Sequence, residues 1–271
     1  MAGSMMEVCK ILGIDRVDMS DRKIVIEEQH GSNANFLVQS VLSNALKKKE
    51  SVCLVLCHNT IGHYHNIGVR FGYDLLKLIE MGQVRVVDLM KIVLNDIDNT
   101  CNNVPTKGMI IPNVTCTTYP EIAERLAVQI KEKCDDAERR NSPIILIIED
   151  INHLLDLGLS VRDTIFFVRC VETYINMRPK SLLCILAHTY GKKNSECSDT
   201  DMIVNALKYE SDLCVTTEPL KTGHSNDASG KLIVHWTVNA VRAMYNWPER
   251  MTYLFKLLDW QVKISTPSAM S

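Results

Sequence analysis

The sequence predicts an α/β fold in which helices cover both faces of one mostly parallel central sheet, with an antiparallel meander at the carboxyl-terminal end. Apolar runs without polar alternation occur at 52–57, 144–148 and 181–188, which is typical of strands buried on both faces. Segments with helical periodicity separate these runs, as in a parallel sheet. Three strand-like runs separated by turn-rich segments then follow at 232–238, 252–258 and 261–265, which indicates antiparallel hairpins.

The composition is ordinary for a globular protein. The chain has 271 residues, of which 46% are hydrophobic and 23% charged, and its formal net charge is −2. The alternation of strands and helices leads us to expect a single domain at 21–265, after an only partly ordered segment at 1–20 and before a short tail at 266–271. Because the chain is not a polycation, any nucleic-acid contact would require a local basic patch or an assembly.

The ten cysteines are scattered and form no CxxC motif, so we expect neither a metal site nor a disulfide framework. Charged residues from Glu7 onward interrupt any signal-peptide pattern. The chain has no apolar run near the roughly 18 residues that a membrane span needs. A reducing compartment fits these features, and we expect the cytoplasm and nucleus.

In the first half of the chain, an apolar strand at 23–27 leads through a turn into an amphipathic helix at 35–48, for which Ser32 or Asn33 is the expected N-cap. The other elements expected in this half are a strand at 52–57, a polar loop at 59–65, a helix near 66–80 and a strand at 84–88. Residues 95–118 contain five asparagines and no periodicity, which predicts a long surface insertion.

In the second half, a helix is expected from an N-cap at Thr118 to the vicinity of Arg140. The elements expected after the strand at 144–148 are a helix at 161–176, a strand at 181–188, a loop at 189–201, a short helix at 202–208 and a strand at 213–217. The strand at 144–148 ends in Glu149 and Asp150, at the sheet edge where open α/β folds bind ligands. In phosphate-loop NTPases an acid at this position helps to hold Mg²⁺. The alternative is a buried strand whose end is capped by two solvated acids.

The turn after the first strand, Gln29-His30-Gly31-Ser32-Asn33, occupies the position of a phosphate loop but lacks its chemistry. A working loop reads GxxxxGK[ST], because backbone N–H groups cradle the phosphates and the lysine reaches the β and γ oxygens. Here there is one glycine and no lysine, and two acids, Glu27 and Glu28, precede the turn. We therefore expect no nucleotide cofactor and no ATP hydrolysis, and no functional Mg²⁺ at Glu149 and Asp150. A GxGxxG dinucleotide motif is also absent from the sequence.

The collinear order of these elements resembles the RecA-like ATPase core, and more narrowly the family of the sixth Elongator subunit, a RecA-like fold without a working phosphate loop. The matching stretches are Gly31-Ser32 with Phe36-Leu37-Val38, 52–57 with His63-Tyr64 and Gly68, 144–150 with Leu154-Leu155 and Leu157-Gly158, 182–188, and 251–256. Together they span most of residues 23–258.

The resemblance implies a non-catalytic subunit of the Elongator complex. In that family it forms a RecA-like heterohexameric ring with the fourth and fifth subunits, which associates with the catalytic subcomplex, binds tRNA and supports wobble-uridine modification. Loops at the carboxyl ends of the central strands face the channel of such rings. We therefore hypothesise that Arg162, Lys192 and Lys193 contact RNA phosphates, although three cations are also compatible with solvated loops.

Two other functions remain open from the sequence. One is an accessory factor of the RecA-paralogue type that binds DNA in recombination. The other is a small-molecule α/β enzyme, for instance a methyltransferase using Glu149 or Asp150 with His188. The missing glycine-rich turn counts against the enzyme, and a fold alone does not fix function.

Overall fold

The computed structural model describes residues 2–92, 119–135, 143–190, 198–220, 223, 225, 227–259 and 261–266. The expected insertion at 95–118, the N-cap at Thr118, the helix end near Arg140 and all but the first residue of the tail at 266–271 lie outside these residues.

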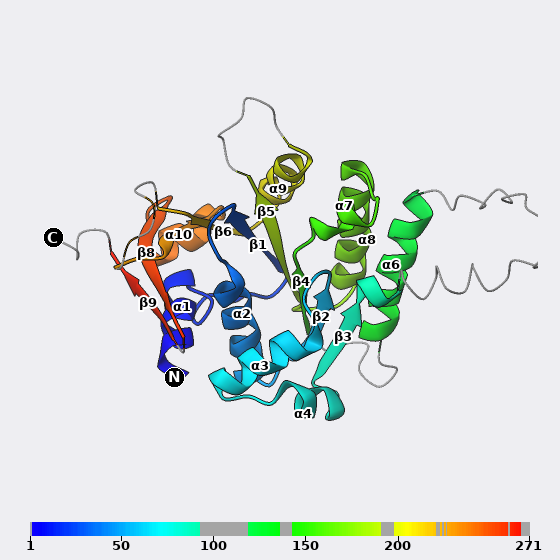
Figure 1. The fold of residues 1–271 in the computed structure, drawn as a ribbon, viewed down its shortest axis with the longest axis horizontal. Coiled ribbons are helices and arrows are strands. Elements are labelled where there is room, and N and C mark those ends of the chain that lie inside the picture. Colours follow the sequence, from blue (N-terminus) through cyan, green and yellow to red (C-terminus); the bar gives the residue numbers. More distant parts are fainter. Residues whose placement is uncertain are drawn as a thin grey trace, which may run out of the picture.

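A nine-stranded sheet forms the centre of the protein (Figure 1). Its strands in chain order are β1 (Arg22–Gln29), β2 (Ser51–Leu56), β3 (Val84–Asp88), β4 (Ile144–Glu149), β5 (Leu182–Thr189), β6 (Leu213–Glu218), β7 (Gly230–Trp236), β8 (Met251–Leu258) and β9 (Gln261–Ser265). Their order across the sheet is β3-β2-β4-β5-β1-β6-β7-β8-β9. The pairings from β3 to β6 are parallel, and those from β6 to β9 are antiparallel. The predicted fold class is therefore confirmed.

Helices cover both faces of the sheet. They are α1 (Ala2–Leu12), α2 (Asn35–Lys47), α3 (Ile61–Phe71), α4 (Leu75–Glu80), α6 (Tyr119–Cys134), α7 (His153–Asp156), α8 (Val161–Asn176), α9 (Asp199–Tyr209) and α10 (Asn239–Tyr245). Buried side chains of α1, α2, α3, α4 and α10 share one apolar cluster, and those of α6, α7, α8 and α9 share another on the opposite face. Side chains alternate along β4, where Ile145 and Ile147 face the first cluster and Leu146 and Ile148 the second. Two covered faces thus explain the unbroken apolar runs of the sequence.

The helix expected near 66–80 is two helices, and the first begins inside the expected loop at 59–65. Thr60 caps α3 by accepting a hydrogen bond from the His63 N–H. Gly72, with φ +88°, ends α3 in the left-handed conformation, and Asp74 then caps α4. The two cap signals between the apolar stripes explain why the expected single helix is wrong.

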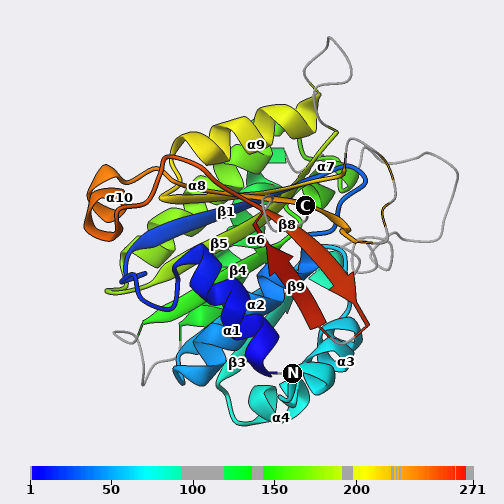
Figure 2. The same ribbon diagram turned by 90° about the vertical axis from the view of Figure 1, so that its left-hand side faces the viewer.

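Helix α1 lies within the segment at 1–20 that the sequence predicts to be only partly ordered. Val8 and Leu12 are fully buried in the first apolar cluster. The helix packs against α2 and strand β9, so that the amino-terminal segment lies beside the end of the meander (Figure 2). Helix α10, between β7 and β8, was not predicted, because its seven residues bury only Val241 and carry almost no periodic signal.

Candidate functional site

The turn between β1 and α2 is tied to the protein by its own backbone. The N–H groups of His30, Ser32 and Asn35 donate to the Thr189 carbonyl at 2.7 Å, to the Gln29 carbonyl at 2.9 Å and to Asn33 Oδ1 at 3.1 Å. In a phosphate loop, such N–H groups point at the ligand. Here they have protein acceptors and are not free to cradle a phosphate.

The expected N-cap at Ser32 or Asn33 is wrong, because Ala34 is the N-cap residue of α2. The Ser32 hydroxyl instead lies 2.7 Å from the Gln29 carbonyl and 2.9 Å from Thr217 Oγ1 on β6. Ser32 therefore ties the turn to the neighbouring strand. Gly31, at φ +86°, supplies the left-handed residue that the tight turn requires.

The carboxylate of Glu28 occupies the anion position at the start of α2. Its Oε2 accepts a hydrogen bond of 2.6 Å from the Ala34 N–H. The amino end of a helix favours negative charge because its first N–H groups lack helical partners. Glu28 supplies this charge from the protein itself. A nucleotide triphosphate does not fit this turn, which offers it a carboxylate in place of free N–H groups and a lysine.

The other acid before the turn, Glu27, faces the opposite side of the sheet. Its carboxylate forms an ion pair with Lys208 and accepts hydrogen bonds of 2.9 Å from Thr189 Oγ1 and Thr216 Oγ1. Glu27 is therefore part of the packing between the sheet and α9.

The acidic end of β4 is buried, so the alternative of two solvated acids is wrong. Glu149 is fully buried, and its Oε2 accepts from the backbone N–H groups of His58 at 3.3 Å and Asn59 at 3.1 Å. Its Oε1 accepts from the Asn59 side-chain amide. Glu149 thus fixes the chain just after β2, because residues 58 and 59 follow that strand.

Asp150 has a left-handed backbone, with φ +48°, which is uncommon for a residue other than glycine and is best tolerated by Asp and Asn. This turn places the Asp150 side chain between two imidazoles. Oδ2 lies 2.8 Å from His153 Nε2, and Oδ1 lies 2.8 Å from His188 Nδ1.

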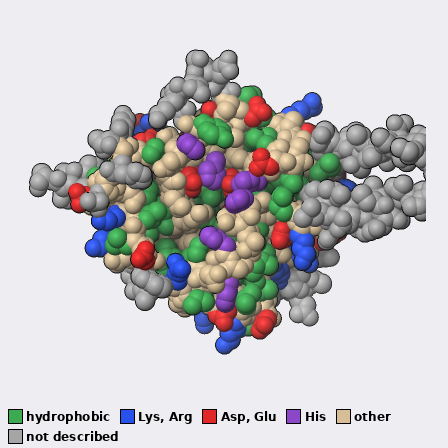
Figure 3. Space-filling model, in the orientation of Figure 1, with side chains coloured by type: hydrophobic (Ala, Val, Ile, Leu, Met, Phe, Trp, Pro, Cys, Tyr) green, Lys and Arg blue, Asp and Glu red, His purple; other side chains and the backbone are tan. Residues whose placement is uncertain are grey.

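These contacts continue into a chain of alternating acids and histidines along the sheet edge. His188 Nε2 lies 2.8 Å from Glu28 Oε1, and His153 Nδ1 lies 2.7 Å from Asp156 Oδ2. The ring of His153 also stacks on that of His58, with centroids 4.2 Å apart and planes at 6°. Figure 3 shows histidine and acidic side chains gathered at the middle of this face. We call Glu28, His188, Asp150, His153 and Asp156 the edge network.

The edge network determines the charges of its members. Hydrogen bonds to Asp150 and, secondarily, Glu28 raise the pKa of His188 from 6.5 to about 10. Burial raises the pKa of Asp150, but hydrogen bonds from His153 and His188 outweigh burial and lower it to about 2. The hydrogen bond to Asp150 likewise raises the pKa of His153. At neutral pH, His188 is therefore an imidazolium and Asp150 a carboxylate.

A cavity of about 230 Å³ opens beside the edge network. It is lined by Asn35, His58, Asn59, Glu149, Asp150, His153, Leu186 and His188. These residues come from the start of α2 and the carboxyl ends of β2, β4 and β5, where parallel α/β sheets bind ligands. We call it the edge cavity.

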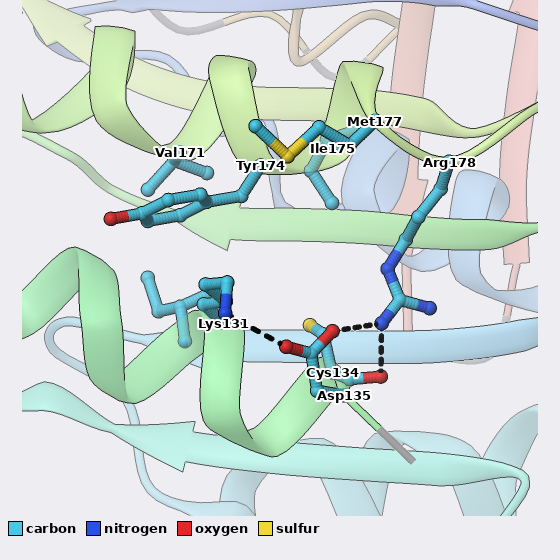
Figure 4. Close-up of a pocket in the computed structure, with 9 residues that line it drawn as sticks. Lys131, Cys134, Asp135, Val171, Tyr174, Ile175, Met177 and Arg178 are labelled. Atoms are coloured by element: carbon cyan, nitrogen blue, oxygen red, sulfur yellow. Dashed lines mark hydrogen bonds and ion pairs between the residues drawn. The ribbon is translucent and has the colours of Figure 1, made fainter. Parts of the chain in front are cut away.

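A second cavity, of about 280 Å³, lies between the last turns of α6 and α8 (Figure 4). Arg178 reaches across it to the Cys134 carbonyl at 2.8 Å and to Asp135 Oδ1 at 2.6 Å. Because helices α6 and α8 each lead back to the start of a strand, this cavity is at the sheet edge opposite to the edge network. It brings together none of the residues that the sequence predicted for the site.

The residues hypothesised to contact RNA are only partly described. Arg162 is exposed in the first turn of α8, between the capping-box residues Ser160 and Asp163. Its helix follows β4 and α7, so Arg162 lies on the side of the sheet that carries the edge network. Lys192 and Lys193 lie outside the described residues.

Sequence reasoning located the turn at 29–33 and the acids Glu149 and Asp150 but missed the roles of Glu28, His153 and Asp156. The available signal was that acids and histidines stand at the ends of several strands predicted to be parallel. Strand order decides which of them meet, and β1 and β5 are neighbours although 152 residues lie between Gln29 at the end of β1 and Leu182 at the start of β5.

Two further observations concern the described residues as a whole. Within the described ranges, no group of three or more His, Cys, Asp or Glu side chains has an arrangement that could hold a metal ion. Among the helices described, none combines the length and the apolar character that crossing a bilayer demands.

The chain is similar to known proteins over nearly its whole length. It is 25% identical to Elongator complex protein 6 of Homo sapiens over 231 residues, which cover 85% of each chain. It is 23% identical to the Xenopus laevis protein of the same name over 264 residues, covering 94% of each. The Dictyostelium discoideum protein is 22% identical and covers 79% of this chain and 81% of its own.

Two solved archaeal structures have the same RecA-like fold. An uncharacterized protein of Pyrococcus horikoshii superposes with a TM-score of 0.59, and the flagellar accessory protein FlaH of Methanocaldococcus jannaschii with 0.56. Each is 13% identical to this chain and covers 96% of it, and the alignments cover 96% and 95% of those proteins, so this likeness concerns the fold alone. The sequence profile of Elongation complex protein 6 matches residues 5–259, and the chain therefore belongs to the Elongation complex protein 6 family.

Proposed function

We propose that this chain is a non-catalytic, structural subunit of the Elongator complex. In this proposal it joins the fourth and fifth subunits in a RecA-like heterohexameric ring, associates with the catalytic subcomplex, and works in the cytoplasm and nucleus. Family membership supports the Elongator assignment. The ring is the assembly expected for a RecA-like fold in this family.

The observation that carries the non-catalytic assignment is the hydrogen bond from the Ala34 N–H to Glu28. A phosphoryl-transfer enzyme needs cationic and N–H groups around the transferring phosphate. At this turn the protein places its own carboxylate at the helix start and ties the nearby N–H groups to protein acceptors. The role of this turn would then be structural.

The alternative of a small-molecule enzyme is less well supported by the site. Asp150 and His188, which such an enzyme would use, form an ion pair with each other and with further partners. The alternative of a recombination factor would share the fold but not the family.

Assembly with the fourth and fifth subunits tests the proposal directly. Purified wild-type chain mixed with both partners is expected to give a heterohexamer by native mass spectrometry, with two copies of each subunit. Persistent separate species at micromolar concentration would contradict the ring. Tagged chain purified from cells should likewise bring down Elongator subunits, whereas recovery of recombination proteins would favour the alternative.

We further propose that the ring binds tRNA and supports modification of its wobble uridine, with Arg162, Lys192 and Lys193 contacting phosphates. Each lost phosphate contact should weaken binding and lower the salt dependence by about one unit of slope. Reversal of all three charges in the assembled ring should therefore reduce both tRNA affinity and its salt slope. An exposed cation on the opposite helix layer, Lys77→Glu in α4, is the matched control. Equal effects of the two changes would contradict the assignment of these three residues.

A further inference from the structure

Two cysteines meet where the last turn of α6 packs against strand β2. Cys53 lies in β2, and Cys134 is the last residue of α6. Both belong to the apolar cluster that the strands share with α6, α7, α8 and α9, and both are free cysteines. A hydrogen bond joins their side chains. The fold thus brings together two thiols that lie far apart in the sequence.

The hydrogen bond makes one thiol the donor and the other the acceptor. Donation from Cys53 lowers the pKa of Cys134, and the same bond raises the pKa of Cys53, which burial raises further. Burial opposes the lowered pKa of Cys134, but the guanidinium groups of Arg178 and Arg85 support it. A thiolate stabilised by nearby cations is the nucleophilic form of cysteine.

Arg178 holds the end of α6 beside this pair. Its Nη2 donates to the Cys134 carbonyl at 2.8 Å and to Asp135 Oδ1 at 2.6 Å. Figure 4 shows Cys134 and Asp135 together at the end of α6, facing Arg178 across the cavity. Arg85 is the register partner of Cys53 on the neighbouring strand β3. Positive charge therefore comes both from the segment after α8 and from the sheet.

The cavity between α6 and α8 gives a small oxidant access to Cys134. Cys134 is one of the residues that line it, although the residue is only 4% exposed. A water molecule takes about 30 Å³, so the cavity, of about 280 Å³, has space for a molecule as small as hydrogen peroxide. Cys53 is fully buried, so an oxidant that enters by this cavity meets Cys134 first.

Cys57, directly after β2, has the opposite surroundings. It belongs to the same apolar cluster as Cys53. Burial and the nearby carboxylates of Glu149 and Asp150 raise the pKa of the Cys57 thiol. This thiol therefore stays protonated and unreactive. Acids thus lie near the cysteine at the carboxyl end of β2, whereas guanidinium groups lie near the pair at its start.

We propose that Cys134 and Cys53 form a peroxide-reactive dithiol, in which Cys134 is the nucleophile and Cys53 the resolving thiol. The Cys134 thiolate attacks one oxygen of hydrogen peroxide, so that an S–O bond forms, the O–O bond breaks, and the departing hydroxide takes up a proton to become water. Cys53 then attacks the sulfenic sulfur of Cys134. The S–S bond forms, the S–O bond breaks, and the hydroxyl leaves with the Cys53 proton as a second water.

Two electrons pass from the two sulfurs to the peroxide in this reaction. The resulting disulfide ties the end of α6 to β2. A dithiol reductant reverses the reaction by thiol–disulfide exchange, which fits the transient disulfides of reducing compartments. The reaction requires no partner subunit and does not depend on the Elongator assignment.

Peroxide treatment of the isolated full chain tests the dithiol. After exposure to increasing hydrogen peroxide, the remaining thiols are alkylated in denaturant and the peptides are identified by mass spectrometry. A peptide pair linked through Cys53 and Cys134 should appear at peroxide concentrations about tenfold below those that oxidise Cys170, because Cys134 has the greater thiolate fraction. Dithiothreitol should remove the link.

Cys170 is the internal control for access. It is more exposed than Cys134, but burial and, secondarily, Glu124 raise the pKa of its thiol. Exposure alone therefore predicts the reverse order, and oxidation of Cys170 before Cys134 would overturn the proposal. So would the absence of the linked peptides at peroxide concentrations that oxidise Cys170 completely.

Cys53→Ser separates the two roles. The serine hydroxyl can still donate to the Cys134 sulfur, but it cannot form the disulfide. Peroxide should therefore leave Cys134 as a sulfenic acid that dimedone traps, at several-fold the wild-type level. Cys184→Ser, at another fully buried thiol, is the matched control and should behave as the wild type.

Equal dimedone labelling of Cys134 in the wild type and both variants would show that Cys53 is not the resolving thiol, and would overturn the proposal. Thermal unfolding of each variant before treatment shows whether the fold is retained. If Cys53→Ser does not fold, the order of oxidation of Cys134 and Cys170 in the wild type still decides the question.

Discussion

His188 and Glu28 are register partners on the adjacent parallel strands β5 and β1, and Nε2 of the imidazole lies 2.8 Å from Oε1 of the carboxylate. The second oxygen of Glu28 accepts the Ala34 N–H at 2.6 Å. One carboxylate thus links β5 to the first residue before α2. At the place where a phosphate would lie in a phosphate loop, this protein has the Glu28 carboxylate, which connects β1 to β5 and to the start of α2.

The pairing of His188 with Asp150 and, secondarily, with Glu28 predicts a loss of stability at alkaline pH. The pKa of His188 is about 10 in the folded protein and 6.5 in the absence of its partners. Between these values the folded state binds more protons than the unfolded state, so the free energy of unfolding falls as the pH rises. The contribution is complete below pH 6.5 and lost near pH 10. Because the side chain is 38% exposed, solvent screens the pair, and we expect about 2 kcal/mol at most.

Urea unfolding of the wild type and of His188→Gln across this pH range measures the effect. The glutamine variant should be less stable at the acidic end of the range, and the two proteins should converge toward pH 10. A difference between them that stays constant with pH would show that the ring contributes by packing and not by its charge.

The apolar runs of the sequence predict the buried strands and their parallel character, because burial on both faces allows no alternation of polar and apolar residues. The helix stripes at 161–176 and 35–48 were found for the same reason, since each buries one face. The edge network was not predictable in this way. Its residues come from β1, β5 and the segment after β4, and only the strand order brings them together.

Asp150→Asn should destabilise the protein mainly above pH 4. The pKa of Asp150 is about 2, against an ordinary 3.8, so its charge stabilises the fold above pH 3.8 and this contribution is lost as the pH falls through 2. The shift corresponds to about 2 kcal/mol. Asparagine tolerates the left-handed backbone, so the change leaves the turn in place and removes the charge together with one of the two acceptor oxygens. Asp21→Asn is the matched control, because Asp21 is exposed and also has a positive φ, of 57°. Comparable losses at both positions in chemical unfolding would contradict the role of the edge network.

Gly13→Ala should destabilise the contact between α1 and the segment after α10. An added Cβ would lie 2.3 Å from Cη2 of Trp247, whose ring also lies against Arg16 at 4.9 Å. Gly72→Ala is the control, since Gly72 has a similar φ, +88° against +79°, and no atom within 4 Å of the added Cβ. The control should cost about 1 kcal/mol for the backbone alone, and Gly13→Ala about 2 kcal/mol more for the clash. Thermal unfolding of the two variants measures the difference, and equal costs would show that Trp247 moves aside freely.

A lysine placed in the turn should not restore nucleotide binding. Asn33→Lys supplies the side chain that a phosphate loop requires and removes the acceptor of the Asn35 N–H. Glu28 still holds the Ala34 N–H, however, and the N–H groups of His30 and Ser32 still donate to the Thr189 and Gln29 carbonyls. The double variant Glu28→Ala/Asn33→Lys removes the competing carboxylate and is the more demanding test. A ligand that binds only the folded state raises the unfolding temperature in proportion to its occupancy, so neither variant should show a rise with Mg²⁺ and ATP. A saturable rise in Asn33→Lys would mean that the missing lysine alone had silenced the site, whereas a rise confined to the double variant would assign the block to Glu28.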